Sequence, residues 1–217
     1  MFRATAASAI LSVFASISNA CDTALILTID VSNSVDSAEF SLQTDGLAAA
    51  LRDPDIINAI VKQEAALAVV QWSGVDKQQV SVPWTRIRTS LDAASLAAQV
   101  SDMPRAFLLS DTAPGDAIDF SVNLFSQTID CKRKVIDISG DGTPNAGGPT
   151  RRARNAAERQ GITINAIAIE SMGLAISNFY RGAVITRDGF VMTARTHREY
   201  PDAIRRKILR ELSIVLG

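Results

Sequence analysis

Short, uninterrupted runs of apolar residues recur along this chain, and segments of helical length separate most of them. Runs of this kind are typical of strands buried on both faces, as in a parallel sheet that crossover helices cover. The sequence predicts strands at residues 24–29, 65–72, 79–84, 134–139, 162–169 and 189–194. It predicts helices at residues 36–52, 55–61, 90–100, 114–125, 150–159 and 174–181, and a last helix from Pro201 with an apolar stripe of Ile204, Ile208, Leu212 and Val215.

The lengths of the connections set the expected topology. Residues 73–78, between the second and third expected strands, are too few for a helical crossover, so this pair should be antiparallel. Helices separate the other strands, which should therefore be parallel. We expect a doubly wound α/β fold, with a mostly parallel six-stranded sheet, one antiparallel edge hairpin and helices on both faces. The 217 residues suit one domain, which we place at residues 21–217.

The first twenty residues have the pattern of an export signal. Arg3 gives a positive start, residues 6–17 are largely apolar, and Ser18-Asn19-Ala20 has the small residues of a cleavage site. A first strand or a buried helix is the alternative interpretation of this segment. No later segment has the roughly 18 consecutive apolar residues of a membrane helix. We expect residues 1–20 to be a signal peptide and the mature protein to be periplasmic or secreted.

Two cysteines allow one intramolecular disulfide in an oxidising compartment. Cys21 lies nine residues before Asp30, and Cys131 lies ten residues before Asp141. If both aspartates end neighbouring parallel strands, both cysteines lie near the opposite ends of the same strands, within disulfide distance. The alternative is a lipid-modified Cys21, although Ser18 stands where bacterial lipoprotein signals usually carry leucine.

The charge balance excludes some classes of partner. The net charge is −1 and the isoelectric point is near 5.9. A chain of this charge has no electrostatic reason to bind nucleic acid or an anionic membrane surface. We expect a monomer without nucleic-acid partners.

Three short polar segments each follow an apolar run or begin a helix. They are Asp30-Val31-Ser32-Asn33-Ser34, Thr112 with Gly115 three residues later, and Asp141-Gly142. In an open α/β sheet, ligands bind beyond the carboxyl ends of the strands where the winding direction reverses. Two carboxylates and three hydroxyls converging there would be hard oxygen ligands for a small divalent cation.

These segments resemble the metal-ion-dependent adhesion site, or MIDAS, of von Willebrand factor type A (vWA) domains. The expected alternation of strands and helices is similar to that fold over nearly the whole mature chain. Four segments resemble, more narrowly, a bacterial exported branch of unknown function: Gln71-Trp72-Ser73, Val82-Pro83-Trp84, Ser139-Gly140-Asp141-Gly142 and Gly161-Ile162-Thr163-Ile164-Asn165.

The resemblance implies a role for each site residue. Ser32 and Ser34 would bind Mg²⁺ or Mn²⁺ directly, and Thr112 would bind it directly or through water. Asp30 and Asp141 would act largely through water or hold the hydroxyls in place. An Asp or Glu carboxylate of a partner protein would complete the coordination of the metal. Ser110 competes with Thr112 for the assignment, but the helix that begins near Gly115 favours Thr112.

The expected function is a non-catalytic, metal-dependent protein-binding module. One alternative is a hydrolase such as a phosphatase with Asp30 as nucleophile, but those enzymes usually carry a second aspartate where this chain has Ser32. A serine hydrolase would need a G-x-S-x-G elbow, which is absent, and would have to use His197, which we expect far from the site. A metal-free structural scaffold is the third class.

The remaining candidate residues have simpler interpretations. Trp72 and Trp84 should pack in the core or at its rim rather than form a ligand platform. His197, the only histidine, is expected to have a surface role. Four arginines of one helix should form a solvated face, with partner steering as the alternative: Arg151, Arg152, Arg154 and Arg159.

Overall fold

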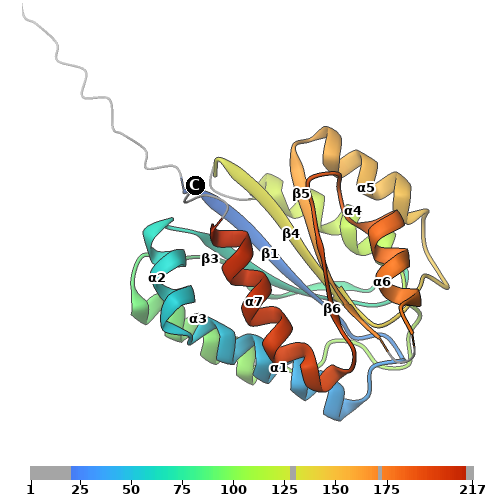
Figure 1. Ribbon diagram of the computed structural model, residues 1–217, viewed down its shortest axis with the longest axis horizontal. Coiled ribbons are helices and arrows are strands. Elements are labelled where there is room, and N and C mark those ends of the chain that lie inside the picture. The colour runs from blue at the N-terminus through green and yellow to red at the C-terminus, as the bar shows by residue number, and fades with distance from the viewer. Residues whose placement is uncertain (1–20, 128–130, 171–172, 214–217) are drawn as a thin grey trace, which may run out of the picture.

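A six-stranded sheet forms the centre of the protein in the computed structural model, which describes residues 21–127, 131–170 and 173–213. The strand order is β3-β2-β1-β4-β5-β6 (Figure 1). The strands are β1 (Thr23–Asp30), β2 (Ala66–Trp72), β3 (Gln78–Arg86), β4 (Arg133–Gly140), β5 (Ile162–Ile169) and β6 (Val191–Ala194). Only the β2–β3 pair is antiparallel in this sheet, so the expected fold class is confirmed. The expected signal peptide lies outside the described residues.

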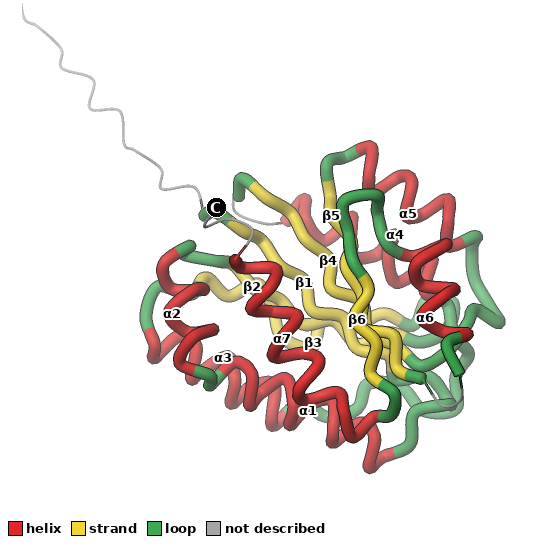
Figure 2. The backbone as a smooth tube through the Cα atoms, viewed as in Figure 1, coloured by secondary structure: helices red, strands yellow, loops and turns green. Residues whose placement is uncertain are grey.

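Helices cover both faces of the sheet and enclose two separate apolar cores (Figures 1 and 2). On one face lie α1 (Ser37–Leu51), α2 (Pro54–Lys62), α3 (Ser90–Asp102) and α7 (Tyr200–Ser213). On the other lie α4 (Pro114–Leu124), α5 (Thr150–Arg159) and α6 (Ala175–Phe179), which continues into a π-helical turn over Tyr180–Val184. Strands that are buried on both faces explain why their sequences read as continuous apolar runs.

The chain reverses its winding direction between β1 and β4. The chain leaves β1 through helices on one face, whereas it leaves β4 through α5 on the other. Ile29 of β1 is in register with Ser139 of β4. The carboxyl ends of these two central strands therefore meet at the switch point where ligands bind in open α/β sheets.

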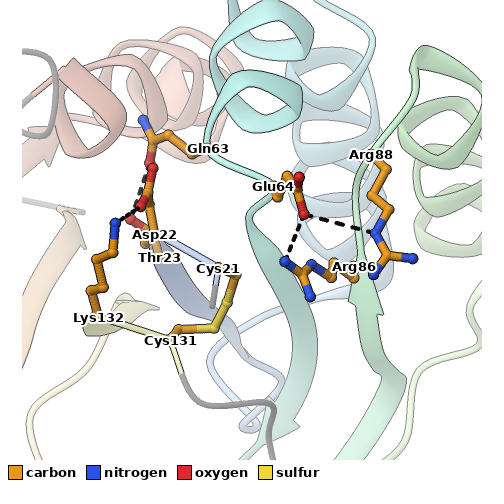
Figure 3. Close-up of a disulfide and its surroundings, with 9 residues drawn as sticks. All are labelled: Cys21, Asp22, Thr23, Gln63, Glu64, Arg86, Arg88, Cys131 and Lys132. Carbon is orange, nitrogen blue, oxygen red and sulfur yellow. Dashed lines mark hydrogen bonds and ion pairs between the residues drawn. A yellow bond between two sulfur atoms is a disulfide. The ribbon is translucent and has the colours of Figure 1, made fainter. Parts of the chain in front are cut away.

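Cys21 and Cys131 form a disulfide at the opposite end of the same two strands (Figure 3). Their Cα atoms are 4.6 Å apart, and the backbone N–H of Lys132 donates to the Cys21 carbonyl at 3.0 Å. Beside them, the Lys132 ammonium lies 2.7 Å from the Asp22 carboxylate. The expected disulfide is confirmed, and it ties the first residues of β1 to the chain entering β4.

A buried charged network joins α7 to the sheet. The Lys207 ammonium, fully buried, lies 2.6 Å from Asp137 of β4 and 2.6 Å from Glu211 of α7. The Asn165 side chain of β5 donates to Glu211 at 2.8 Å. Around this network the expected apolar stripe is buried at Ile204, Ile208 and Leu212, whereas Val215 lies outside the described residues. No sequence pattern predicts this network.

We predict that removing the disulfide destabilises the fold without changing it. The bond closes a loop with a sequence separation of 110, for which the chain-entropy account gives about 4–5 kcal/mol as an upper limit. Denaturant unfolding of the Cys21→Ser/Cys131→Ser variant, with the reduced wild type as a matched control, measures this loss. Equal unfolding midpoints for the oxidised wild type and the double variant would contradict the prediction.

We predict that Lys207→Met lowers the free energy of unfolding by about 3–5 kcal/mol, because the buried carboxylates of Asp137 and Glu211 lose the ammonium that lies 2.6 Å from each. Lys62→Met, which removes an exposed lysine from α2, is the matched control and should change stability by less than about 0.5 kcal/mol. Chemical denaturation of both variants makes the comparison. A Lys207→Met variant as stable as the control would show that the network does not hold α7.

Candidate metal centre

The loop after β1 begins with a fully buried carboxylate. Asp30 Oδ1 accepts a hydrogen bond from the backbone N–H of Ser32 at 2.8 Å. The Val31 N–H donates to the Trp72 carbonyl at 2.9 Å, and the Asn33 N–H donates to the Ser110 carbonyl at 2.8 Å. These contacts fix the backbone of the loop against the neighbouring segments, so its hydroxyl groups have defined positions.

Hydroxyl and carboxylate oxygens form a continuous row from this loop to the end of β4. Ser32 Oγ and Ser34 Oγ are 3.1 Å apart. Ser34 Oγ donates to Asp141 Oδ1 at 2.6 Å, although the two residues are 107 positions apart in sequence. Ser32 is buried and Ser34 is exposed, so the row runs from the interior to the surface. The structure thus brings four of the five expected site residues into one chain of contacts.

Thr112, the fifth expected residue, packs against the segment after β4. A Cβ atom on Gly142 would lie 3.3 Å from Thr112 Cγ2 and 3.5 Å from its Oγ1, so glycine allows this close approach. The Thr112 N–H donates to Asn145 Oδ1 at 2.8 Å, and its carbonyl accepts from the Asn145 N–H at 3.1 Å. Ser110, the competing residue, instead accepts a hydrogen bond from the Gly74 N–H through its hydroxyl at 3.3 Å. The helix that follows Thr112, α4, begins at Pro114.

Burial makes the charge of Asp30 unfavourable. Removal from water, with the negative charge of Asp141 as a second cause, raises the pKa of Asp30 from 3.8 to about 7. Asp30 Oδ2 is buried and has no hydrogen-bond partner among the described residues, and the same holds for the hydroxyl of Tyr180. Both groups face Gly140, where any Cβ atom would collide with them. Burial, together with the charges of Asp30 and Asp141, also raises the pKa of Tyr180.

This donor set fits a hard divalent cation. It combines neutral hydroxyls, two carboxylates that repel one another, and a buried carboxylate oxygen without a partner. Hydroxyl and carboxylate oxygens are the ligands that Mg²⁺ and Mn²⁺ prefer. A positive ion beside Asp30 and Asp141 would offset both their repulsion and the cost of burying them.

His197 lies beside Asp141, at the edge of this site. The expectation of a surface role far from the site is therefore wrong. The residue is 8% exposed; its Nδ1 atom is 3.0 Å from Glu39 Oε1, and its Nε2 atom is 3.9 Å from Asp141 Oδ2. The reason is topological. Because β6 pairs in parallel with β5, the chain leaves β6 at the same edge of the sheet as Asp141. The parallel direction expected for the last strand was the signal that could have placed His197 here.

Two further residues support the site and were not foreseen. Arg105 holds the loop after β1, since its Nη2 atom donates to the carbonyls of Val31 and Ser32, both at 2.9 Å. Asn145 holds the backbone of Thr112 through the two hydrogen bonds described above. Neither residue belongs to a sequence motif, because each acts by bonding to backbone groups.

The remaining candidates take the simpler roles. Trp72 is fully buried, and Trp84 packs against Phe125 with ring centroids 5.6 Å apart and ring planes tilted by 42°, so both tryptophans pack as expected. Of the arginines of α5, Arg151, Arg152 and Arg159 are exposed and Arg154 is half-buried. Arg152 pairs with Asp119 of α4 at 2.9 Å. The expected solvated face is present at the three exposed positions.

Comparison with known proteins places the chain in a family and the fold in a larger group. A family model described as "Protein of unknown function (DUF1194)" matches residues 20–215. No curated protein matches the sequence.

Solved structures with the same fold are vWA domains and proteins that contain them. Proximal thread matrix protein 1 (PTMP1) from the mussel byssus, with a zinc-occupied MIDAS motif, matches with a TM-score of 0.68 and 20% identity over 89% of this chain and 48% of that one. A von Willebrand factor type A protein from Catenulispora acidiphila matches at 0.63 and 16%, over 89% and 43%. BatB from Bacteroides thetaiotaomicron matches at 0.58 and 15%, over 89% and 99%. The chain spans about half the length of the PTMP1 chain, and at these identities the likeness shows a vWA fold alone.

We predict that Asp30→Asn stabilises the metal-free protein. In the presence of a chelator at pH 7, the amide removes an unfavourable buried charge while Oδ1 can still accept from Ser32, and the free energy of unfolding should rise by about 1–3 kcal/mol. Denaturant unfolding measures the change. Asp188→Asn, at an exposed carboxylate, is the matched control and should differ from wild type by less than about 0.5 kcal/mol.

The same comparison should depend on pH. Since the pKa of Asp30 is raised in the folded state, the folded protein binds this proton more tightly than the unfolded chain. The stability that this proton contributes is therefore lost as the pH rises from 3.8 to about 7. The Asp30→Asn variant has no carboxyl group at this position, so it does not lose stability in this way. The difference in free energy of unfolding between Asp30→Asn and the wild type should therefore shrink as the pH falls toward 4. An advantage that is absent at pH 7, or independent of pH, would contradict the electrostatic account.

Proposed function

We propose that this chain, which belongs to the DUF1194 family, is an exported protein-binding module that recognises an acidic side chain through a divalent cation. The observation that carries the proposal is the row of contacts from Ser32 through Ser34 to Asp141, beside the buried Asp30. This row joins two loops at the switch point of a vWA fold, and it opens to solvent at Ser34.

The residues of the row, together with Asp30 and Thr112, would each have a separate part in holding Mg²⁺ or Mn²⁺. Ser32 and Ser34 offer hydroxyl oxygens as direct ligands, and Thr112 offers a third, directly or through water. Asp30 and Asp141 orient these groups, as the 2.8 Å bond to the Ser32 N–H and the 2.6 Å bond from the Ser34 hydroxyl indicate. A cation with mostly neutral ligands keeps positive charge, which attracts an Asp or Glu carboxylate of a partner protein.

The disulfide and two of the similar structures support export. The Cys21–Cys131 disulfide suits an oxidising compartment, periplasmic or extracellular. Among the similar structures, PTMP1 is a protein of the mussel byssus and SpaC of Lactobacillus rhamnosus is a pilus adhesin. Within the described part of the chain, none of the helices has the length and apolar character that crossing a bilayer requires. We propose a monomer whose recognition does not involve nucleic acid.

The contacts of Ser34 argue against hydrolysis as the function. In a serine hydrolase the imidazole contacts the nucleophilic hydroxyl and a carboxylate lies behind the imidazole. Here the order is different, because Asp141 contacts Ser34 and His197 lies on the far side of Asp141. A phosphatase of the aspartyl type would need a carboxylate in place of Ser32. We therefore propose binding rather than catalysis.

Loss of single hydroxyls should weaken metal binding. We predict that Ser32→Ala and Thr112→Val each lower the affinity for Mn²⁺ roughly tenfold to hundredfold, because each removes a proposed ligand. Isothermal titration calorimetry measures the affinities. Ser126→Ala, which removes an exposed hydroxyl at the opposite end of α4 from Thr112, is the control and should bind within twofold of wild type. Undiminished affinity in both site variants would refute the assignment.

Partner binding should require the cation and one acidic side chain. We predict that immobilised protein retains a partner from an envelope extract in Mg²⁺ or Mn²⁺ and releases it in chelator. In the purified pair, changing one partner Asp or Glu to its amide should abolish binding, because the amide carries no charge. Binding at full strength in chelator would instead favour a metal-free scaffold.

A further inference from the structure

A hollow of about 330 Å³ lies at the outer end of the hydroxyl row, where Ser34 and Asp141 both line it. Its lining residues are Ser34, Glu39, Asp141, Glu170, Thr196 and His197. Three of these residues are acidic, and none is lysine or arginine. The hollow therefore has a negative lining and adjoins the hydroxyl row, with which it shares Ser34 and Asp141.

The imidazole of His197 presents a nitrogen without a partner to this hollow. His197 Nε2 is buried and makes no hydrogen bond within the part of the chain that the structure describes, and the whole residue is only 8% exposed. The nearest acidic atom, Asp141 Oδ2, is 3.9 Å away, which is too far for a hydrogen bond. A buried polar atom left in this state costs about 1–3 kcal/mol, so the arrangement favours a ligand that can contact it.

Glu39 fixes the orientation of the ring. Glu39 Oε1 lies 3.0 Å from His197 Nδ1, while Glu39 Oε2 accepts the Asp36 N–H at 2.9 Å in the capping box of α1. A proton on Nδ1 that faces Glu39 leaves the lone pair of Nε2 directed toward Asp141. Metal-binding histidines commonly have this arrangement, with one ring nitrogen held by a carboxylate and the other free to bind.

The two oxygens of Asp141 face different groups. Oδ1 accepts from Ser34 in the hydroxyl row, whereas Oδ2 faces His197 Nε2. One ligand atom from each of Glu39, Asp141 and His197 lies within 4.8 Å of the others. Since Zn²⁺ binds nitrogen at about 2.0–2.1 Å and oxygen at about 2.0–2.2 Å, two ligands of one ion lie from about 3.4 Å apart, at a tetrahedral angle, to about 4.3 Å apart, on opposite sides of it. The observed 3.9 Å is within this range.

We infer that His197 Nε2 and Asp141 Oδ2 form a second cation site, distinct from the hydroxyl row and selective for a transition metal such as Zn²⁺. Imidazole nitrogen suits Zn²⁺, Cu²⁺ and Ni²⁺, whereas Mg²⁺ prefers oxygen alone. Glu39 positions the imidazole, and the solvent of the hollow supplies the remaining ligands. The two sites share Asp141 but take different metals.

Because His197 is the only histidine of the chain, spectroscopy can identify this site directly in untagged protein. Electron paramagnetic resonance of wild-type protein with one equivalent of Cu²⁺ should show hyperfine coupling to one imidazole nitrogen. This signal should vanish in His197→Gln. A wild-type spectrum without nitrogen coupling would overturn the inference, even if the variant failed to fold.

Calorimetry separates the two proposed sites. His197→Gln should lower the affinity for Zn²⁺ at least tenfold and leave the affinity for Mn²⁺ within twofold of wild type. Ser32→Ala should lower the affinity for Mn²⁺ at least tenfold and leave the affinity for Zn²⁺ within twofold of wild type. Failure of one proposed site is therefore distinguishable from failure of the other. Glu39→Gln, which retains a residue suited to the capping box, should weaken Zn²⁺ binding while thermal melting shows an intact fold. Zn²⁺ affinity unchanged in His197→Gln would overturn the second site.

Discussion

The pairing of β1 with β4 places Asp30 and Asp141 at one edge of the sheet, and the rest of the site is arranged around these two carboxylates. Asp30 is fully buried, and one of its oxygens accepts no hydrogen bond from residues 21–127, 131–170 and 173–213, which the structure describes. Burial and repulsion by Asp141 make its charge unfavourable in the protein alone. Such an arrangement is retained at a cost in stability, and a bound cation is the simplest source of compensation.

The remainder of the fold keeps this edge rigid. The disulfide closes the opposite end of β1 and β4, so the two strands are fixed at both ends. Arg105 holds the backbone of the first loop, and Asn145 holds that of Thr112. On the other side, the Lys207 network binds α7 to β4 and β5, and the turn before α7 carries His197 to Asp141. Binding groups held by bonds of this kind lose little freedom when a ligand arrives.

Most of the fold could be predicted from the sequence because its signals are local. Buried strands read as apolar runs, and the short connection after Trp72 fixes the antiparallel pair. The segments at the ends of β1 and β4 could be placed together because parallel strands end at the same edge of the sheet, whereas Thr112 follows no strand and was placed through the helix that begins near Gly115. His197 was misplaced because its position depends on the path of the chain after a four-residue edge strand, β6. Arg105 and Asn145 bond to backbone groups, which have no sequence signature.

Sequence patterns also could not predict the buried charges that join α7 to the sheet. Asp137 interrupts an apolar strand, and Lys207 and Glu211 lie beside an apolar stripe, so each alone suggests an exposed position. Only the packing of α7 on the sheet brings the three together. Charged residues at such positions are explained by their partners, and the partners follow from tertiary structure.

The proposed function requires a cation between the loops after β1 and β4. Anomalous scattering from a crystal containing Mn²⁺ tests for this cation most directly. We predict a manganese peak about 2.0–2.3 Å from the hydroxyl oxygens of Ser32 and Ser34, with Asp30 and Asp141 beside it. A crystal saturated with Mn²⁺ in which this position has no peak, or in which the metal binds elsewhere, would contradict the account.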